Sequence, residues 1–329
     1  MIVSVILCTF NRCDSLQIAL ESAAAQVNLD PGSWELLIID NNSKDRTAEV
    51  AKGFCLRYPD RFRYIFESQQ GKSHALNRGI RESKGSILAF MDDDVVVAPD
   101  WLKNLLLPFE DSAWIGVGGR IAPPANFVTP EWLALDGPYD LSGILAMFDK
   151  GREGKELTEP PFGTNMAFRR EVFERCGLFR PDLGPCPGSE IRGEDTEFGR
   201  RVFKSGLRLW YQPCAVVHHA IPPGRLCKGY FLRFQFDQGR ASIREKDKGF
   251  PIWFIPRIYF TIPKIIAGEL IRRVVAWIFS IDPQSRFQRK CMVWTNVGQI
   301  AELIERIFRG HLASGDQAPA LVNGKENRA

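Results

Sequence analysis

Residues 86–94 read SILAFMDDD, an apolar run followed by an acidic triplet. The apolar run is typical of a buried strand, and three carboxylates follow that run at once. Apolar runs and helical patterns alternate along the first 110 residues, at 2–8, 14–26, 34–39, 47–57, 62–67 and 72–82. Short strands separated by helices predict a parallel sheet whose polar strand ends line a ligand crevice. The sequence therefore predicts an α/β fold.

The acidic triplet predicts a metal site. Asp92, Asp93 and Asp94 repel one another, and a hard divalent cation bound through carboxylate oxygens would offset that cost. Such an ion would bridge the two phosphates of a nucleotide sugar. A solvated acidic turn or a helix cap is the alternative. In the pair His218-His219 either imidazole could ligate the same ion, with a structural role as the alternative.

A second acidic motif, Gly193-Glu194-Asp195, stands at the start of a predicted helix. Transfer to an alcohol requires a base that takes the hydroxyl proton, and a carboxylate at a helix start facing a cleft can serve. In isolation, the motif is more typical of carboxylates that stabilise the helix dipole.

Polar residues also follow the first two predicted strands. Asp40 ends the second strand, and Thr9, Asn11 and Arg12 follow the first, where they can bind a base or a ribose. The alternative is that they only form turns. Lys72 could meet phosphate, with plain surface charge as the alternative. The first strand is not followed by the GxGxxG pattern of a dinucleotide site.

The last third of the chain differs in character. Of the 43 Lys and Arg and the 39 Asp and Glu residues, 17 and 9 lie after residue 225, where basic and aromatic residues interleave. Lys264–Phe279 could lie in a membrane interface as an amphipathic helix. The alternative is a helical subdomain that packs on the core or forms a dimer. The sequence contains no uncharged apolar run of the roughly 18 residues expected of a membrane span.

Composition shifts predict four regions. Residues 1–110 form the strand–helix half, and 111–225 form a second half that begins with a Gly- and Pro-rich, loop-heavy connection over 111–160. Residues 226–312 form the basic, aromatic helical region, and 313–329 a polar, flexible tail. The eight scattered cysteines lack CxxC spacing and favour reduced thiols, and the amino-terminal segment does not have the pattern of a signal peptide.

Taken together, these segments resemble the family-2 glycosyltransferases of GT-A fold, over about residues 2–240. The resemblance lies in an ordered series of motifs: 3–12 (VSVILCTFNR), 39–43 (IDNNS), 71–79 (GKSHALNRG), 90–94 (FMDDD) with 99–102 (PDWL), 162–170 (FGTNMAFRR), 193–195 (GED) and 213–225 (PCAVVHHAIPPGR).

The resemblance implies a GT-A (Rossmann-like) mixed sheet with a parallel nucleotide-binding half over 1–110, an acceptor-binding half over 111–225 and a helical carboxyl-terminal region. It implies inverting transfer of a sugar, expected from a UDP-sugar, to an acceptor hydroxyl, with Asp195 as base beside Glu194. Mn²⁺ or Mg²⁺ would be held by the DxD motif and the segment after residue 213, through Asp94, Asp92 and His219. The implied donor-binding residues are Thr9, Asn11, Arg12, Asp40, Lys72, Asp92, Asp93, Gly163 and Asn165.

The implied setting is polysaccharide or glycolipid biosynthesis at the cytoplasmic face of the plasma membrane, with a sugar or lipid-linked sugar as acceptor. An inactive sugar-nucleotide-binding scaffold of the same fold is the alternative, but it should lack one of the two carboxylate motifs. A nucleotidyltransferase would need a Gly-, Arg- or Lys-rich loop where Thr9-Phe10-Asn11-Arg12 stands. Nucleic-acid binding is disfavoured because the carboxyl-terminal aromatic residues lie within apolar stretches.

Overall fold

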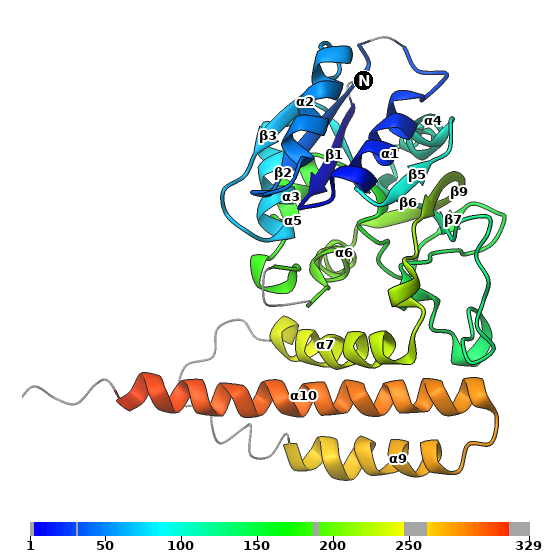
Figure 1. The fold of residues 1–329 in the computed structure, drawn as a ribbon, viewed down its shortest axis with the longest axis vertical. Coiled ribbons are helices and arrows are strands. Elements are labelled where there is room, and N and C mark those ends of the chain that lie inside the picture. The colour runs from blue at the N-terminus through cyan, green and yellow to red at the C-terminus, as the bar shows by residue number, and fades with distance from the viewer. Residues whose placement is uncertain (1–2, 31, 187–190, 247–261, 316–329) are drawn as a thin grey trace, which may run out of the picture.

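The computed structural model describes residues 3–30, 32–186, 191–246 and 262–315. Their nine strands form one sheet in the order β3-β2-β1-β4-β8-β6-β9-β5, with β7 against β9 (Figure 1). The strands are β1 Val3–Thr9, β2 Trp34–Asp40, β3 Phe62–Phe66, β4 Ile87–Asp92, β5 Val95–Val97, β6 Trp114–Ala122, β7 Lys155–Glu156, β8 Asn165–Arg169 and β9 Arg208–His219. The helices are α1 Cys13–Ala24, α2 Thr47–Arg57, α3 Lys72–Glu82, α4 Trp101–Leu106, α5 Glu171–Cys176, α6 Glu194–Lys204, α7 Lys228–Lys246, the π-helix η7 Ile265–Leu270, α9 Ile271–Ile278 and α10 Pro283–Gly315.

The amino-terminal half of the sheet is parallel. β1 lies between β2 and β4 and runs parallel to both, so the strand order reverses direction there. Ligands of open α/β sheets bind outside the carboxyl ends of strands at such a reversal. Antiparallel pairing begins where β8 joins β4, so the sheet is mixed. The predicted α/β fold with a parallel first half is confirmed.

The central strand β6 corrects one expectation. A loop-heavy connection was predicted over 111–160, but β6 occupies nine of these residues and pairs with β8 and β9. The glycines of this segment favour a loop when the sequence is considered alone. In the structure they lie in β6, where packing against neighbouring strands requires them. A Cβ atom on Gly116 would overlap the ring of Phe168, and one on Gly119 would overlap the amide of Asn165. Close packing of neighbouring side chains against the strand, rather than a turn, explains these glycines.

The carboxyl-terminal helices lie beneath the sheet domain in successive layers. α7 is nearest the sheet, α10 follows, and α9 is outermost (Figure 1). A second hydrophobic core joins α7 and α10 to the segment before β7, where Trp132 packs edge-on against Phe231 of α7 and Phe287 of α10. α7 and α10 are therefore packed on the part of the chain that precedes β7. Residues 316–329, most of the predicted tail, lie outside the described residues.

α7 and α10 cross closely. A Cβ atom on Gly239 would collide with the backbone of Thr295, and one on Gly298 with the backbone of Phe236. Glu302 of α10 receives hydrogen bonds from two arginines of α7, Arg240 and Arg244. Although burial opposes ionisation, these bonds keep the pKa of Glu302 below its usual value. Glycine contacts and buried ion pairs thus fix the two helices together.

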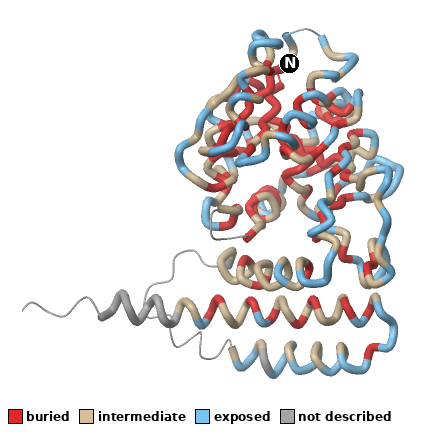
Figure 2. Tube along the Cα trace, in the orientation of Figure 1, coloured by how far each residue is buried: buried red, intermediate tan, exposed pale blue. Residues whose placement is uncertain are grey.

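α9 has an exposed apolar face. Ile271, Val275 and Ile278 lie one turn apart on it and are about half exposed, at 55%, 48% and 60%. Figure 2 shows the contrast with α10, which has a buried stripe. The predicted helix over Lys264–Phe279 is present as η7 followed by α9. Across the described residues, no helix combines the length and apolar character needed to cross a membrane.

Candidate active site

The acidic cluster lies where β1 and β4 end side by side. The register of these strands places Cys8 opposite Asp92, so Thr9 and the aspartates share one edge of the sheet. β5 follows directly and pairs with the end of β9, which sets Val95 opposite His219. The fold therefore brings together motifs that are more than a hundred residues apart in the sequence.

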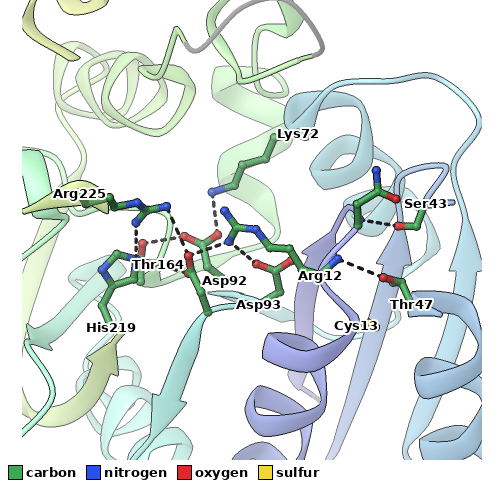
Figure 3. Close-up of polar contacts among 12 residues, drawn as sticks. Arg12, Cys13, Ser43, Thr47, Lys72, Asp92, Asp93, Thr164, His219 and Arg225 are labelled. Carbon is green, nitrogen blue, oxygen red and sulfur yellow. Dashed lines mark hydrogen bonds and ion pairs between the residues drawn. The ribbon is translucent and has the colours of Figure 1, made fainter. Parts of the chain in front are cut away.

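Basic side chains balance the three carboxylates (Figure 3). Nζ of Lys72 lies 2.7 Å from Asp92, and one guanidinium nitrogen of Arg12 lies 2.9 Å from Asp93 and 2.7 Å from Asp94. The Thr164 hydroxyl donates to the other oxygen of Asp92 at 2.8 Å. Positive groups thus offset the mutual repulsion of carboxylates that lie almost out of water.

His219 faces Asp94 with one ring nitrogen. Its Nδ1 lies 3.1 Å from the Leu145 carbonyl oxygen, a contact that requires a donating N–H there. Nε2 lies 3.4 Å from both an oxygen of Asp94 and a nitrogen of Arg225, so it accepts from Arg225 when the ring is neutral and donates to Asp94 when the ring is protonated. A backbone carbonyl that fixes the tautomer of an imidazole is the usual outer partner of a metal-ligating histidine.

The donor set fits a divalent cation that has few protein ligands. The described residues contain no group of three or more His, Cys, Asp or Glu side chains that could hold a metal ion. Mg²⁺ sites commonly use one or two carboxylates, with substrate phosphates and water as the other ligands. Asp94 and His219 therefore supply enough protein ligands only when a diphosphate completes the coordination.

Charge pairing decides the ionisation of Asp94 and Lys72, whereas burial raises the pKa of Asp93 to about 6. Burial opposes the ionisation of Asp94, but the contact with His219 and the charges of Arg12 and Arg225 hold the pKa of that carboxyl well below its usual value. Burial likewise opposes protonation of Lys72, but the carboxylates of Asp92 and Glu194 raise its pKa. Both groups are therefore charged at neutral pH.

Glu194 and Asp195 occupy the start of α6. Glu194 is buried, with 3% of its surface exposed, and lies 3.8 Å from Nζ of Lys72. Asp195 accepts the backbone N–H of Gly163 at 2.8 Å and that of Thr196 at 2.6 Å. These bonds orient the Asp195 carboxylate while the rest of its lone pairs stay available.

Burial raises the pKa of Glu194 to about 7, with the nearby Asp195 carboxylate raising it further and Lys72 lowering it. In the unfolded chain the same carboxyl ionises near 4.5. The folded state thus keeps a proton that the unfolded state has lost, so stability falls as pH rises from about 4.5 to about 7. We expect Glu194→Gln to remove the contribution of this carboxyl to the loss of stability with rising pH.

Melting temperatures of both proteins from pH 4.5 to 8 test this expectation. As pH rises, the melting temperature of the wild type should fall relative to that of the variant, by roughly 2–4 °C for each kcal/mol of unfolding free energy that the wild type loses. A difference between the two proteins that stays constant across this range would contradict the shifted pKa.

A cavity of about 680 Å³ contains most of the predicted site. The predicted residues on its wall are Thr9, Arg12, Lys72, Asp92, Asp93, Asp94, Glu194, Asp195 and His219. Among the described residues, four other predicted donor-binding residues do not line it: Asn11, Asp40, Gly163 and Asn165. Gly163 stays close, through its bond to Asp195.

The other three support the backbone around the cavity. Asp40 accepts the Ser43 N–H and the Tyr64 hydroxyl, both at 2.9 Å. Asn11 accepts the Lys44 N–H at 2.6 Å and so joins two strand-end loops. Asn165 is fully buried and bonds to the Trp101 indole and to two backbone carbonyls.

The cavity also has residues that the sequence did not indicate. Gln70 lines it, donates to the Asn41 carbonyl, and has a buried amide oxygen without a hydrogen-bond partner. Arg225 joins the charged cluster, 3.7 Å from Asp94. α7 and α10 contribute Phe234, Gln235, Gln238 and Met292. Arg225 lies within the motif at 213–225 and Phe234 within the basic, aromatic region, whereas the four other residues, Gln70, Gln235, Gln238 and Met292, have no local sequence signal.

Comparison with known proteins places the chain among sugar transferases. Residues 4–177 match the sequence model of the family described as Glycosyl transferase family 2. Glycosyltransferase AglE of Haloferax volcanii is 28% identical over 257 residues, which cover 78% of this chain and 75% of that protein. The glucosyl-dolichyl phosphate glucuronosyltransferase of the same organism is 25% identical, over 67% of this chain and 70% of that protein.

One solved structure supports the fold. The mannosyltransferase PcManGT from Pyrobaculum calidifontis, in complex with GDP-Man and Mn²⁺, superposes with a TM-score of 0.60 and 19% identity. The superposition covers 91% of this chain and 86% of that one. At this identity the likeness demonstrates a common fold, and the predicted GT-A architecture with a helical carboxyl terminus is confirmed.

Proposed function

Because this chain belongs to glycosyl transferase family 2 and is a glycosyltransferase, we propose that it transfers a sugar from a nucleoside diphosphate sugar to an acceptor hydroxyl with inversion of the anomeric carbon. UDP is the expected nucleotide, and polysaccharide or glycolipid synthesis is the expected setting. One observation carries the proposal: the Asp94–His219 pair and the Asp195 carboxylate line the same cavity. Retention of both carboxylate motifs argues against an inactive scaffold.

The nucleotide is proposed to lie across the ends of β1 and β4. Lys72 and Arg12 line this part of the cavity and supply positive charge for a diphosphate. The orphan amide oxygen of Gln70 can accept an N–H of the base, which is a use for a buried acceptor that otherwise costs stability. Asp40 supports this region by holding the Ser43 loop.

In the proposed reaction, Asp195 accepts the proton of the acceptor hydroxyl while that oxygen attacks the anomeric carbon. The bond from this carbon to the phosphate oxygen breaks, and its electron pair leaves with the nucleoside diphosphate. A divalent cation held by Asp94 and His219 would neutralise charge on the departing diphosphate. Gly163 and Thr196 hold the Asp195 carboxylate in place through their N–H groups.

A donor panel tests the proposal. The full chain is incubated with Mn²⁺, a mixture of octyl glycosides as acceptors and each of several UDP-, GDP-, CMP- and dTDP-sugars, and nucleotide release is measured. We expect release from one UDP-sugar to exceed the others, and anomeric inversion in the product by NMR. Release from GDP-mannose instead would overturn the choice of nucleotide, and retained configuration would overturn the mechanism.

We further propose that α9 rests on the cytoplasmic face of the plasma membrane, so that the acceptor is a lipid-linked sugar. The exposed stripe of Ile271, Val275 and Ile278 is flanked by exposed Lys264 and Arg272. A helix with an apolar face and basic flanks suits an interface containing anionic lipids. The apolar face continues through the α9–α10 turn, where Phe279 and Ile281 are 77% and 96% exposed.

Replacing Ile271, Val275 and Ile278 together with serine is expected to reduce binding to vesicles containing phosphatidylglycerol at least about tenfold, since each buried aliphatic side chain contributes about 1.5–3 kcal/mol. Sedimentation with vesicles gives the bound fraction. Leu56→Ser on α2, where the side chain is 83% exposed, is the matched control and should bind like the wild type. Undiminished sedimentation of the triple variant would refute the membrane contact.

A further inference from the structure

The carboxyl-terminal helices form one wall of the reaction cavity. Phe234, Gln235 and Gln238 of α7 and Met292 of α10 line it together with the strand-end residues. The match to the family ends at residue 177, so this wall comes from a part of the chain beyond it. A wall of this kind can adapt the shared chemistry to a particular substrate.

The α7 wall adjoins the proposed base. The Gln238 amide donates to the Arg192 carbonyl at 2.6 Å, and a Cβ atom on Gly193 would lie 4.0 Å from the Cβ of Ala241. These contacts set α7 against the backbone that leads into Asp195. On the other side of this helix start, Glu194 faces Lys72 of the acidic cluster. The start of α6 therefore separates the nucleotide end of the cavity from the α7 end.

Inverting transfer sets where the acceptor lies. The acceptor oxygen attacks from the face opposite the departing diphosphate, and its proton goes to Asp195. With the diphosphate at the acidic cluster, the remainder of the acceptor extends toward α7 and α10. The same part of the cavity is closed by Leu141 and Ile144, which precede β7.

The chemistry of this wall suits a saccharide. A sugar ring presents hydroxyl groups that exchange hydrogen bonds and an apolar face of C–H groups. Phe234 supplies an aromatic surface, and Gln235 and Gln238 supply amides. The amide oxygen of Gln235 accepts the Thr295 hydroxyl at 2.9 Å, so a ligand would meet this amide as a donor. Apolar surface with a few oriented polar groups is typical of a specific ligand site.

We propose that α7 and α10 form the acceptor subsite, which binds a saccharide residue against Phe234 and Gln235 with its reacting hydroxyl at Asp195. This inference rests on the proposed function and extends it to the acceptor. The close crossing at Gly239 and Gly298 and the ion pairs of Glu302 keep the two helices in a fixed relation. The subsite is thus formed before the acceptor arrives, which lowers the entropic cost of binding.

The test separates acceptor from donor. With the donor chosen by the panel and Mn²⁺ present, nucleotide release is measured at increasing concentrations of octyl glycosides of the common hexoses and N-acetylhexosamines. Phe234→Ala and Gln235→Leu are each expected to raise the KM for the stimulating glycoside at least about tenfold, the scale of one lost apolar or hydrogen-bonding contact in a substrate site. Affinity for the nucleotide, measured by calorimetry, should change less than about twofold. The rate of nucleotide release in the absence of glycoside, where water replaces the acceptor, should also change less than about twofold.

Thr295→Val is the comparison variant, because it removes the hydrogen bond that orients the Gln235 amide but leaves that amide on the cavity wall, so its effect should be smaller than that of Gln235→Leu. It should keep the wild-type KM within about threefold. Unchanged glycoside KM in both cavity variants would overturn the subsite, as would a parallel loss of nucleotide affinity or an equal effect of Thr295→Val. A wild type that no glycoside stimulates would overturn the saccharide class. Failure of the proposed function differs, since then no nucleotide sugar is cleaved even by the wild type.

Discussion

Asp195→Asn is expected to lower kcat at least about a hundredfold, because a general base contributes typically about 10²–10⁴-fold. Affinity for the nucleotide sugar should change by less than about threefold, since the base acts on the acceptor proton in the transition state. Asparagine has nearly the same shape and can still accept the Gly163 N–H, but its amide is not basic enough to take the proton of the acceptor hydroxyl. Turnover, donor affinity and melting temperature of this one variant distinguish a general base from a purely structural residue.

The competing interpretation gives Asp195 only a structural role at the helix start. Gly193 is the N-cap of α6, and it makes no side-chain capping bond. At the second residue of the helix, loss of the Asp195 charge would cost the helix start only about 0.3–1 kcal/mol. A purely structural Asp195 would therefore leave the variant with nearly normal turnover. Glu194→Gln provides a comparison, because Glu194 faces Lys72 and should influence donor binding more than proton transfer.

Removal of the metal is expected to abolish sugar transfer. Excess EDTA should stop nucleotide release, and Mn²⁺ or Mg²⁺ added beyond the chelator should restore it. Asp94→Ala should lower kcat/KM at least about a hundredfold, since the metal supplies several kcal/mol of transition-state stabilisation and about 1.4 kcal/mol corresponds to a factor of ten. This aspartate should be the most damaging position in the triplet, because it faces His219 directly.

Binding of Mn²⁺ followed by electron paramagnetic resonance, with UDP present, gives a second measurement that does not depend on turnover. The variant should bind Mn²⁺ more weakly, whereas Asp100→Ala, an exposed carboxylate a few residues further on, should bind it normally. Full activity in EDTA, or wild-type Mn²⁺ affinity in Asp94→Ala, would refute the assignment of Asp94 as a ligand.

Much of the fold could be predicted from the sequence because its first half follows simple periodicities. α3 begins and ends at the residues that its pattern indicates, and β2 begins where predicted and ends one residue later. Parallel strand ends then bring Asp92 and Lys72 to one edge by geometry alone. β6 could not be predicted, because nothing near Gly116 shows that the Phe168 ring fills the space of its missing side chain.

The same limit applies to the cavity. Its acidic side consists of residues with clear local chemistry, such as Asp94, and these could be assigned from the sequence. Its other side depends on which face of α7 is turned toward the sheet domain, and that is decided by contacts across long sequence separations. Gln235 and Met292 have no special pattern around them, so only the packing of α7 and α10 reveals their position on the wall.

The order of these elements along the chain has a consequence in time. Synthesis runs from the amino terminus, and domains generally fold as their residues emerge. The last strand, β9, ends at His219, so every strand of the described sheet and both members of the Asp94–His219 pair are available before α7 is made. Met292 follows more than seventy residues later. A growing chain can therefore complete the acidic side of its cavity while the other side is still open, and it closes that other side only after α10 has been made.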